Sequence, residues 1–463
     1  MSLHTMLQER SSKGKPVKVG VIGAGKFSSM FLSQARLAPG IQVVGIADLL
    51  PEKAAKNCAA VGWPQGSTAF ADKAGAINDL AAGKITAITT DALELIRAEC
   101  DVILEITGNP EAGTVHAVEA IRAGRHLVMP NVETDCFVGP LLSEMASKAG
   151  VCFSMAYGDQ PALIMELIDW ARTVGFDVVC AGKGTRFQPQ YHYSTPATVW
   201  KFYGLSEEMV ATGGYNAQMF NSFLDGTKSA IEMCAVANGG GLMPQKGGLR
   251  FPPVSIHHLQ QVLKPGEHGG ILPHAGTVEC VASEDRFNAP VHDDLRWGVY
   301  VVLGAPTDYV KRCFAEYGMK TDTTGLYTAL YRPYHFIGLE LNMSIASVAL
   351  RGEPTGTSRY FMGDVAATAK KDLTPGELLD GEGGFTVFGT LVPSRESPER
   401  SILPMGLTGK AKVVRNVAKG RILTYSDVEL DTSTPAYKIR KEMEGRARKG
   451  DFRIANSEYR IMK

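Results

Sequence analysis

The sequence predicts an α/β protein that begins with a doubly wound parallel sheet, and two observations near the N-terminus support this. A run of apolar and β-branched residues, Val17–Ile22, ends at the glycine-rich turn Gly23-Ala24-Gly25. A helical segment follows from Lys26, and a second strand-like run, Ile41–Asp48, ends in an acidic residue. A strand, a turn, a helix and another strand in this order form a βαβ unit, which places the two strands parallel in one sheet.

The same alternation continues to about residue 157. We expect strands at 101–106, 126–129 and 151–155, and helices at 113–123 and 138–149. After this region the sequence pattern changes, and we expect loops rich in Gly, Pro, Tyr and His around a helical segment at 215–238. A chain of 463 residues is about three times the ~150 residues of an average domain. We therefore predict domains at 1–157 and 158–350, the second being α+β, and a small all-β module with a tail at 351–463.

The third domain is predicted from a weak internal repeat. Lys371-Asp-Leu-Thr-Pro-Gly-Glu-Leu-Leu and Arg415-Asn-Val-Ala-Lys-Gly-Arg-Ile-Leu share a polar pair, a central glycine and a final aliphatic pair. Similar turns alone can produce a repeat of this length. We interpret the two segments as two β-hairpins.

The turn after the first strand matches a variant of the dinucleotide-binding fingerprint. Gly23 permits the tight turn, and Gly25 lets the backbone approach a pyrophosphate at a helix N-terminus. Lys26, Phe27 and Ser28 complete the motif, with Ser28 in place of the third small residue. The surrounding strand and helix, with an acidic strand end further on, are the context that supports such a motif. This predicts a Rossmann-type domain; a glycine-rich turn in a domain that binds nothing is the alternative.

The acidic strand end is relevant to the choice of cofactor. Asp48 can accept hydrogen bonds from a ribose 2′-hydroxyl group, which favours NAD. Lys26 or Lys53 could instead meet the 2′-phosphate of NADP. Two later strand ends are expected at the same edge of the sheet, where Thr107, Gly108 and Asn131 could line the cofactor site.

Candidate groups for the chemistry lie in the second domain. Lys183 stands between two glycines after a strand, which predicts a mobile, exposed lysine that could meet a phosphate or an oxyanion; a solvated loop lysine is the alternative. If one helix runs from Asn221, then Asn221, Asp225, Lys228 and Glu232 share a face. A buried stripe of this kind needs polar partners, which a substrate, a metal or another polar group could supply. The alternative is an ion pair on the surface.

Further substrate-binding candidates flank this helix and follow in a later cluster. Tyr215 and Asn216 precede the helix, and Arg332 and His335 belong to Tyr-Arg-Pro-Tyr-His. Arginine can clamp a carboxylate or a phosphate bidentately, and histidine can carry protons.

Composition excludes several classes of protein. Lys and Arg number 48, and so do Asp and Glu, whereas nucleic-acid-binding domains usually carry a basic excess. No apolar run approaches the ~18 residues of a membrane span, and the polar N-terminus does not read as a secretory signal. Eight scattered cysteines without a CxxC pair suit a reducing compartment. We expect a cytoplasmic protein that binds neither nucleic acid nor membrane.

In these segments the chain resembles the homoserine dehydrogenase-like oxidoreductases, and within them the 1-deoxy-D-xylulose-5-phosphate reductoisomerase-like branch with a C-terminal SAF domain of β-clip fold. The resemblance rests on six segments: Glu105-Ile-Thr-Gly, Pro130-Asn-Val-Glu-Thr-Asp135, Gly158-Asp-Gln-Pro161, Ala181-Gly-Lys-Gly184, Ser222-Phe-Leu-Asp-Gly-Thr-Lys-Ser229 and Arg332-Pro-Tyr-His335. In one respect the chain departs from the pattern. Homoserine dehydrogenases carry a lysine after the motif asparagine, whereas Val132 follows Asn131 here.

The resemblance implies an NADPH-dependent, dimeric enzyme that uses Mg²⁺ or Mn²⁺. The implied reaction converts 1-deoxy-D-xylulose 5-phosphate to 2-C-methyl-D-erythritol 4-phosphate in isoprenoid precursor synthesis. Under this hypothesis Asp225 and Glu232 bind the metal, with Glu133 or Asp135 as substitutes. Lys228 polarises the carbonyl group, while Lys183 and Arg332 hold the phosphate of a small phosphorylated sugar.

Two other functions remain open from the sequence. One is a simple NAD(P)-dependent dehydrogenase of another polyol, a sugar acid or a tetrose phosphate. The other is a dinucleotide sensor without catalytic activity.

Overall fold

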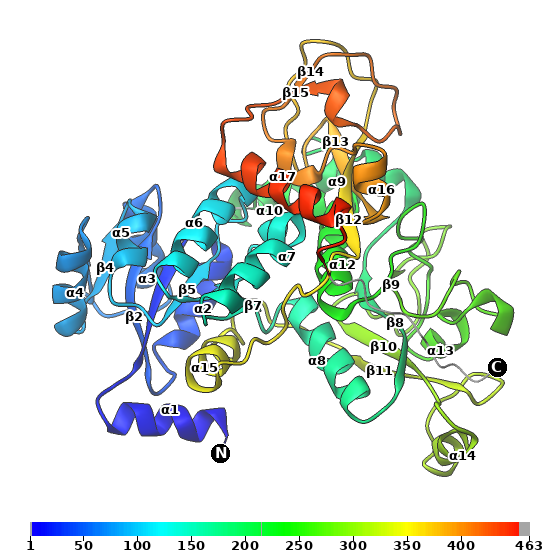
Figure 1. Ribbon diagram of the computed structural model, residues 1–463, viewed down its shortest axis with the longest axis horizontal. Helices are drawn as coiled ribbons and strands as arrows, with labels where there is room; N and C mark the ends of the chain where they lie inside the picture. Colours follow the sequence, from blue (N-terminus) through cyan, green and yellow to red (C-terminus); the bar gives the residue numbers. More distant parts are fainter. Residues whose placement is uncertain (1, 214, 453–463) are drawn as a thin grey trace. The chain divides into compact units, whose positions relative to one another are not determined.

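The computed structural model describes residues 2–213 and 215–452, and the chain divides into two compact units (Figure 1). The first unit contains the residues up to Leu163 together with Phe336–Ser358, and the second contains Ile164–His335 and the chain from Arg359 onward. The segment 336–358 thus belongs with the N-terminal residues, whereas the predicted boundaries divide it between the other two domains.

The first unit contains a seven-stranded parallel sheet with the order β3-β4-β2-β1-β5-β6-β7. Its strands are β1 Val17–Ile22, β2 Ile41–Ala47, β3 Thr68–Phe70, β4 Thr86–Thr89, β5 Val102–Glu105, β6 His126–Met129 and β7 Phe153–Met155. Its helices are α1 Leu3–Ser12, α2 Lys26–Ala35, α3 Pro51–Ala60, α4 Ala74–Ala82, α5 Ala92–Arg97, α6 Pro110–Arg122, α7 Val132–Lys148 and α15 Asn342–Arg351, while α8 Gln160–Thr173 crosses into the second unit. The predicted doubly wound α/β fold is confirmed.

The core of this unit forms where the central strands meet their helices. Val19 and Val21 of β1 pack with Phe31 and Leu32 of α2 in one buried cluster. Ile345 of α15 belongs to the same cluster although it lies far along the chain. Because central parallel strands are covered on both faces, they read as nearly continuous apolar runs, and this is why β1 and β2 could be predicted from the sequence.

One helix of this unit begins earlier than the expected 138–149. The Asn131 side chain accepts a hydrogen bond from the backbone N–H of Thr134 at 3.1 Å and caps the N-terminus of α7. Asparagine is among the preferred N-cap residues. Glu133 and Asp135 therefore lie in the first turn of a helix and not in a loop.

The second unit is built on a mixed four-stranded sheet with the order β11-β10-β8-β9. Strands β8 and β9 are parallel, and β10 is antiparallel to both β8 and β11. The strands are β8 Asp177–Thr185, β9 Thr277–Ala282, β10 Val299–Gly304 and β11 Tyr327–Arg332. The helices are η1 Pro189–Tyr193, α9 Val199–Tyr203, α10 Glu207–Gly213, α11 Ala217–Leu224, α12 Thr227–Gly240, α13 Leu259–Val262, η2 Gly266–His268 and α14 Asp308–Glu316.

The predicted long polar helix is two helices. Helix α11 ends at Leu224 and α12 begins at Thr227, with Gly226 between them at φ +85°. A left-handed residue interrupts the helical path, so the polar residues before and after it do not form one stripe. The prediction that Asn221, Asp225, Lys228 and Glu232 share a helix face is wrong.

The C-terminal part of the second unit is a small β structure, as predicted, followed by one long helix. Strands β12 Gly363–Ala369 and β13 Val387–Pro393 pair antiparallel, as do β14 Lys412–Val413 and β15 Val428–Glu429. The helices are α16 Glu396–Glu399, η3 Met405–Leu407, η4 Tyr425–Asp427 and α17 Pro435–Arg448.

The internal repeat has a structural counterpart, although not as two separate hairpins. Leu373 and Val417, which are equivalent in the repeat, exchange backbone hydrogen bonds of 2.8 and 3.0 Å. The Gly376 N–H donates to the Val413 carbonyl oxygen and the Gly420 N–H donates to the Ala369 carbonyl oxygen, both at 2.8 Å. These two hydrogen bonds occupy equivalent positions in the two copies of the repeat. The two copies therefore pair with each other about a local pseudo-twofold axis.

No helix in the described residues is long and apolar enough to cross a membrane.

Candidate functional site

The turn after β1 combines a left-handed glycine with open space beside a helix N-terminus. Gly23 has φ +106° and its N–H donates to Ala47 at 2.7 Å; a Cβ there would lie 3.1 Å from the Ile106 carbonyl group. A Cβ on Gly25 would meet nothing within 4 Å, so space is open beside the N-terminus of α2. Helix N-termini bind anions through free N–H groups and the helix dipole.

Asp48 holds this turn in place. Its Oδ2 accepts from the Ala24 N–H at 2.6 Å and its Oδ1 accepts from Leu50 at 2.9 Å. The Asn57 amide donates to the Ala24 carbonyl oxygen at 2.7 Å. Since each carboxylate oxygen can accept more than one hydrogen bond, Asp48 keeps capacity for a ribose hydroxyl group.

The other residues of the motif lie in the first turn of α2. Lys26 is exposed, Phe27 packs partly buried against the core, and Ser28 is buried. The Ser28 hydroxyl oxygen has no hydrogen-bond partner within 2–213 and 215–452. Residues of this turn thus match the fingerprint in position and in conformation.

A buried polar cluster lies at the carboxyl ends of β5 and β6. Glu105 is fully buried and accepts hydrogen bonds from Thr107 Oγ1 at 2.6 Å and from Asn131 Nδ2 at 2.7 Å. His116 Nδ1 lies 3.1 Å from the same carboxylate. Gly108 follows at φ +68° with open space around its Cα. Thr107 and Asn131, predicted to line the cofactor site, are brought together by Glu105.

Asp135 is a second buried carboxyl group of the first unit. Ser358 donates to its Oδ1 at 2.5 Å, and Oδ2 has no hydrogen-bond partner in the described part of the chain. Burial raises the pKa of Asp135 to about 7, although the Ser358 hydrogen bond opposes this shift.

In the second unit, Lys183 forms an ion pair with Glu232. Strand β8 continues through Lys183 to Thr185, and only 5% of the lysine surface is exposed. Its Nζ meets the Glu232 carboxylate, which α12 presents to the sheet. The predicted exposed loop lysine is therefore wrong. A buried charged pair of this kind can exchange a proton only with a group that reaches it.

Asp225 is held by a lysine from the C-terminal β structure. Lys370 Nζ lies 2.6 Å from Asp225 Oδ2 and donates to the carbonyl oxygens of Ser194 and Gly384 at 2.8 and 2.7 Å. The Thr227 N–H donates to Asp225 Oδ1 at 2.8 Å. Burial raises the pKa of Asp225 above its ordinary value, and the Lys370 charge opposes this effect.

Asn221 joins the same region by three hydrogen bonds. Its amide donates to the carbonyl oxygens of Ser194 and Gly383 at 3.1 and 2.8 Å, and its side-chain oxygen accepts from Ser194 Oγ at 2.6 Å. The predicted need of this polar region for partners is thus met by the protein itself. This arrangement stabilises the break between α11 and α12.

The remaining predicted residues do not converge on one point. Asn216 caps α11 by accepting from Gln218 and Met219, and Tyr215 is exposed beside Trp200 and Phe220. His335 Nδ1 donates to the Trp297 carbonyl group at 2.6 Å, three residues beyond Arg332 at the end of β11. Lys228 is partly buried in the first turn of α12.

The predicted metal ligands do not fit a metal ion in the arrangement that the structure shows. The carboxylates of Asp225 and Glu232 are each neutralised by a buried lysine, and Glu133 lies in the other unit. Across the described residues, no three His, Cys, Asp or Glu side chains come together as a metal site.

Three polar residues with a clear structural role were missed from the sequence. They are Lys370, His116 and the fully buried Glu279 of β9. Lys370 and Glu279 meet their partners Asp225 and Gln245 across long sequence separations, and His116 meets Glu105 from the next helix, so no local pattern marks any of the three. The Lys370-Lys371-Asp372 run reads as a solvated turn, and only the adjoining repeat could have drawn attention to it.

Comparison with protein families identifies one region of similarity. Residues 158–341 match the model described as oxidoreductase DRL, catalytic domain, which spans less than half of the chain. This match supports an oxidoreductase. No curated protein sequence matches the chain.

Solved structures resemble the chain only distantly. A probable dehydrogenase from Thermotoga maritima is 12% identical, with a TM-score of 0.36. The aligned region covers 73% of this chain and 90% of the dehydrogenase chain. The 1-deoxy-D-xylulose 5-phosphate reductoisomerase from Zymomonas mobilis is 15% identical over 48% of this chain and 57% of its own, with a TM-score of 0.31. Apo scyllo-inositol dehydrogenase from Lactobacillus casei is 12% identical over 40% of this chain, with a TM-score of 0.25, and the match spans 48% of its length.

Proposed function

We propose that the chain is an oxidoreductase that uses a nicotinamide dinucleotide to reduce a small sugar-like carbonyl compound. The observation that carries this proposal is the match of residues 158–341 to an oxidoreductase catalytic domain. As the specific reaction we propose the NADPH-dependent conversion of 1-deoxy-D-xylulose 5-phosphate to 2-C-methyl-D-erythritol 4-phosphate. A homodimer and a cytoplasmic location belong to the same proposal.

The residues of the first unit fit the dinucleotide. The open space at Gly25 and the N–H groups of the first turn of α2 suit its pyrophosphate, and Asp48 suits the adenosine ribose. When bound, the nicotinamide ring supplies the hydride. Lys26 is exposed one residue beyond Gly25 and is the group that we propose for a 2′-phosphate.

Lys183 and Glu232 are the groups that we propose for proton transfer. A carbonyl oxygen that gains negative charge during hydride addition needs a proton, and a lysine ammonium group can donate it. Glu232 would orient the ammonium group of Lys183 and balance its charge. Lys228 on the same helix is the competing donor.

A simple dehydrogenase without a rearrangement step is the second candidate. Asp225 and Glu232 each form an ion pair with a buried lysine, and this favours the simple dehydrogenase. Reduction alone requires only hydride and proton transfer, whereas the resemblance links the reductoisomerase to a divalent cation. Its substrate would be another polyol, a sugar acid or a tetrose phosphate.

One experiment separates these candidates. Turnover of 1-deoxy-D-xylulose 5-phosphate is measured with NADPH and with NADH, with and without EDTA, and the product is identified by NMR. A branched carbon skeleton supports the reductoisomerase, and oxidation of the cofactor to give an unbranched product supports the simple dehydrogenase. Binding of the dinucleotide without turnover across a panel of ketoses and sugar acids would contradict an enzyme and favour the sensor.

A lysine comparison tests the proton donor. Lys183→Met and Lys228→Met variants are assayed side by side on the substrate that turns over. We expect Lys183→Met to lower kcat with little change in dinucleotide affinity, whereas Lys228→Met should retain most of the activity. The opposite ranking would move the role to Lys228.

A further inference from the structure

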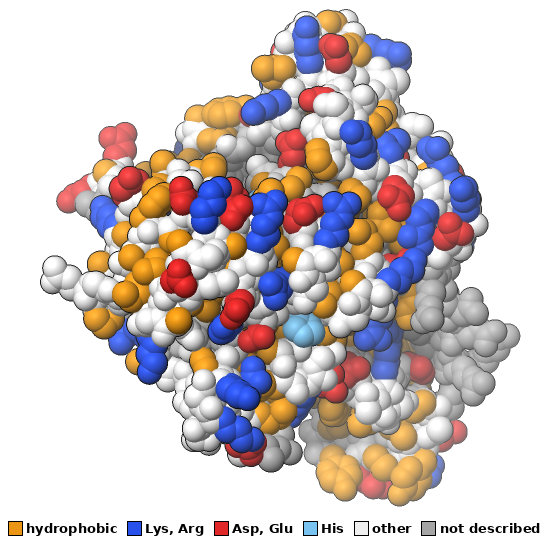
Figure 2. All heavy atoms as spheres, turned by 60° about the vertical axis from the view of Figure 1, so that its left-hand side comes forward, with side chains coloured by type: hydrophobic (Ala, Val, Ile, Leu, Met, Phe, Trp, Pro, Cys, Tyr) orange, Lys and Arg blue, Asp and Glu red, His pale blue; other side chains and the backbone are white. Residues whose placement is uncertain are grey.

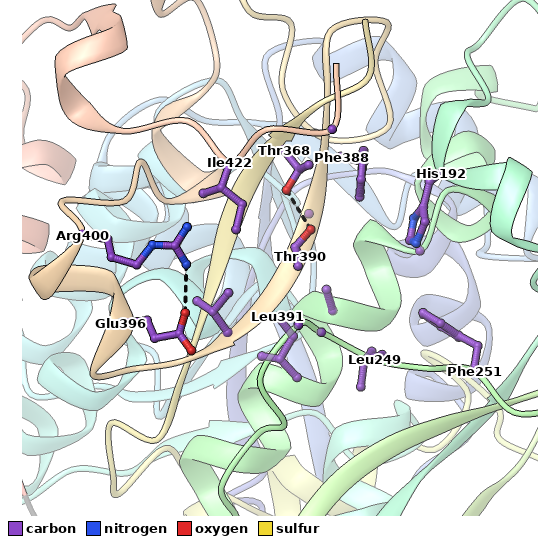
Figure 3. Close-up of a pocket in the computed structure, with 17 residues that line it drawn as sticks. His192, Leu249, Phe251, Thr368, Phe388, Thr390, Leu391, Glu396, Arg400 and Ile422 are labelled. Atoms are coloured by element: carbon purple, nitrogen blue, oxygen red, sulfur yellow. Dashed lines mark hydrogen bonds and ion pairs between the residues drawn. The ribbon is translucent and has the colours of Figure 1, made fainter. Parts of the chain in front are cut away.

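The second unit contains a cavity of about 300 Å³ that the proposed reaction does not use. It is lined by α12, by the loop at residues 247–251 and by the β12–β13 pair, as Figure 3 shows. Ala230 of α12 lines it, whereas Glu232 lies two residues further along the helix and pairs with Lys183. A volume of this size is at the lower end of small-molecule sites.

Aromatic and aliphatic side chains form one part of the cavity wall, and glycines, threonines and an ion pair form the rest. The His192 ring stacks on Phe388 with ring centres 4.5 Å apart and 21° between the planes. Phe251 lies on another side, where it stacks on Phe187 at 3.8 Å. Leu391 and Ile422 add aliphatic surface (Figure 3). Flat apolar walls favour a planar ring as the ligand.

A buried carboxyl group holds one wall of the cavity in position. Glu279 accepts hydrogen bonds from the Gln245 amide at 2.6 Å and from the backbone N–H groups of Arg250 and Phe251 at 3.1 and 3.2 Å. Phe251 adopts φ +49°, which is rare for a bulky residue and persists only where the surroundings enforce it. These hydrogen bonds hold the loop in the conformation that forms the cavity wall.

His192 provides a specific hydrogen-bond acceptor at this wall. Its Nδ1 lies 2.8 Å from the Asp225 carbonyl oxygen, and because a carbonyl oxygen can only accept, Nδ1 carries the proton. Burial lowers the pKa of His192 and favours the neutral ring, in which Nε2 is an acceptor. Within the part of the chain that the structure describes, no residue donates a hydrogen bond to Nε2.

The charges at the cavity cancel. Arg400 and Glu396 both line it and form an ion pair at 2.9 Å, and the hydroxyl groups of Thr368 and Thr390 bond to each other at 2.7 Å (Figure 3). Because Arg400 is paired with Glu396, this part of the lining carries no net charge that would attract an ionic ligand.

From these observations we propose that the cavity binds a small, uncharged aromatic molecule whose O–H or N–H group donates to His192 Nε2. The ring lies among the aromatic and aliphatic walls, and the single donor fixes its orientation. This site is independent of the nicotinamide-dependent reaction and would exist whichever substrate the enzyme reduces.

Phenol is the probe, and toluene is its matched control with the same ring and no donor. Binding of each to the full-length protein is measured by ligand-observed NMR titration. One net hydrogen bond corresponds to about a three- to tenfold difference in affinity, so phenol should bind that much more tightly than toluene. Benzoate, which adds a charge, should bind more weakly than phenol.

Two variants locate the site. In His192→Phe the ring remains but the acceptor is lost, so phenol and toluene should bind alike. In Ala230→Met a larger side chain enters the cavity from α12, so both ligands should bind at least about tenfold more weakly. Circular dichroism and a cooperative urea unfolding curve report whether each variant is folded, and Ala230→Met decides alone if His192→Phe does not fold.

Three results would overturn the proposal. The first is equal affinity of the native protein for phenol and toluene, or no binding of phenol. The second is a preference for phenol that persists in His192→Phe. The third is unchanged binding in a folded Ala230→Met variant.

Discussion

Single residues with buried charges carry the strongest electrostatic constraints in this protein. Asp225 and Lys370 are both almost fully buried, and their charges lie 2.6 Å apart. Removal of one partner leaves the other as an uncompensated buried charge, which typically costs about 3–5 kcal/mol. We expect Lys370→Met to lower the free energy of unfolding by this amount, as measured by urea denaturation.

An exposed ion pair is the control for this prediction. Arg122 and Glu119 form an i,i+3 pair at 2.7 Å with side chains that are 68% and 37% exposed. Arg122→Met should change the free energy of unfolding by less than about 1 kcal/mol, because water screens such pairs. Equal effects of the two substitutions would contradict a structural role for Lys370.

Asp135 makes a pH-dependent contribution to stability. Burial raises the pKa of Asp135 in the folded protein to about 7, above the ordinary range of an aspartate. The folded state therefore retains a proton that the unfolded state has released, and stability is lost as the pH rises from about 4 through 7.

Asp135→Asn removes this titration. Urea denaturation should show the variant gaining stability relative to the native protein by roughly 3 kcal/mol between pH 5 and pH 8. A difference between variant and native protein that is the same at both pH values would contradict the raised pKa.

Local spacing explains which site residues could be predicted. Gly23, Gly25 and Asp48 were found because a strand, a turn and an acidic strand end follow one another along the chain. Lys370 could not be found, because its partner Asp225 lies in a different element and no periodicity joins the two. Lys183 was identified, but its burial was not, because the flanking glycines read as a loop and the structure places all three residues in β8.

At the scale of the element, the break between α11 and α12 depends on one backbone conformation. Gly226 has φ +85°, and a Cβ there would lie 3.3 Å from His192 Cε1. Gly226→Ala should lower the free energy of unfolding by about 1–2 kcal/mol, since L-residues are strained in this region.

At Gly445, in contrast to Gly226, we expect replacement by alanine to stabilise the protein. It lies inside α17, and a Cβ there would meet nothing within 4 Å. Gly445→Ala should raise the free energy of unfolding by about 0.5–1 kcal/mol, because it reduces the freedom of the unfolded chain. Both variants are measured by urea denaturation, and a loss of stability at both positions would contradict this explanation.

The turn between β1 and α2 offers a variant that separates binding from folding. The backbone of Gly25 is not in the left-handed region, and space for a Cβ is open. Gly25→Ala should therefore leave stability unchanged within about 0.5 kcal/mol. It should weaken NADPH binding about tenfold or more, by about 1.4 kcal/mol, because the methyl group occupies the phosphate position.

Fluorescence titration with NADPH measures this effect. Gly75→Ala is the matched control, since that glycine also has open space around it but belongs to α4 in the same unit. Unchanged affinity in Gly25→Ala would place the dinucleotide elsewhere.

Elements were predictable where one pattern dominated. The central strands β1, β2, β5 and β6 are short apolar runs between turns, and their positions agree with the expected ones within a residue or two. The region between β2 and β5 was not assigned, and its strand β3 has only three residues. The break at Gly226 was missed because the apolar residues on both sides of it follow the periodicity of a single helix.

At the scale of the whole molecule, acidic and basic side chains are mixed on the face that Figure 2 shows. This agrees with the equal numbers of the two kinds in the sequence. The anions proposed here are therefore expected to bind through local backbone and side-chain geometry and not through a broad field.

A bound dinucleotide should stabilise the whole protein. A ligand present at 100 times its Kd adds about 2.7 kcal/mol to the free energy of unfolding when only the folded state binds it. We expect saturating NADPH or NADH to raise the Tm, and Gly25→Ala to need a higher concentration for the same shift. A Tm that neither dinucleotide changes would contradict the cofactor assignment.

The discontinuous first unit has a consequence for synthesis on the ribosome. Helix α15 supplies Ile345, Ala346 and Val348 to the same core as β1 and α2, yet about three hundred residues separate it from α2 along the chain. When the last strand of the parallel sheet has emerged, this part of the core is still uncovered, and it stays so until the sheet of the second unit has been translated. The nascent chain therefore carries an incomplete first unit through much of its elongation, and a chain truncated before residue 342 would expose the apolar surface that α15 normally covers.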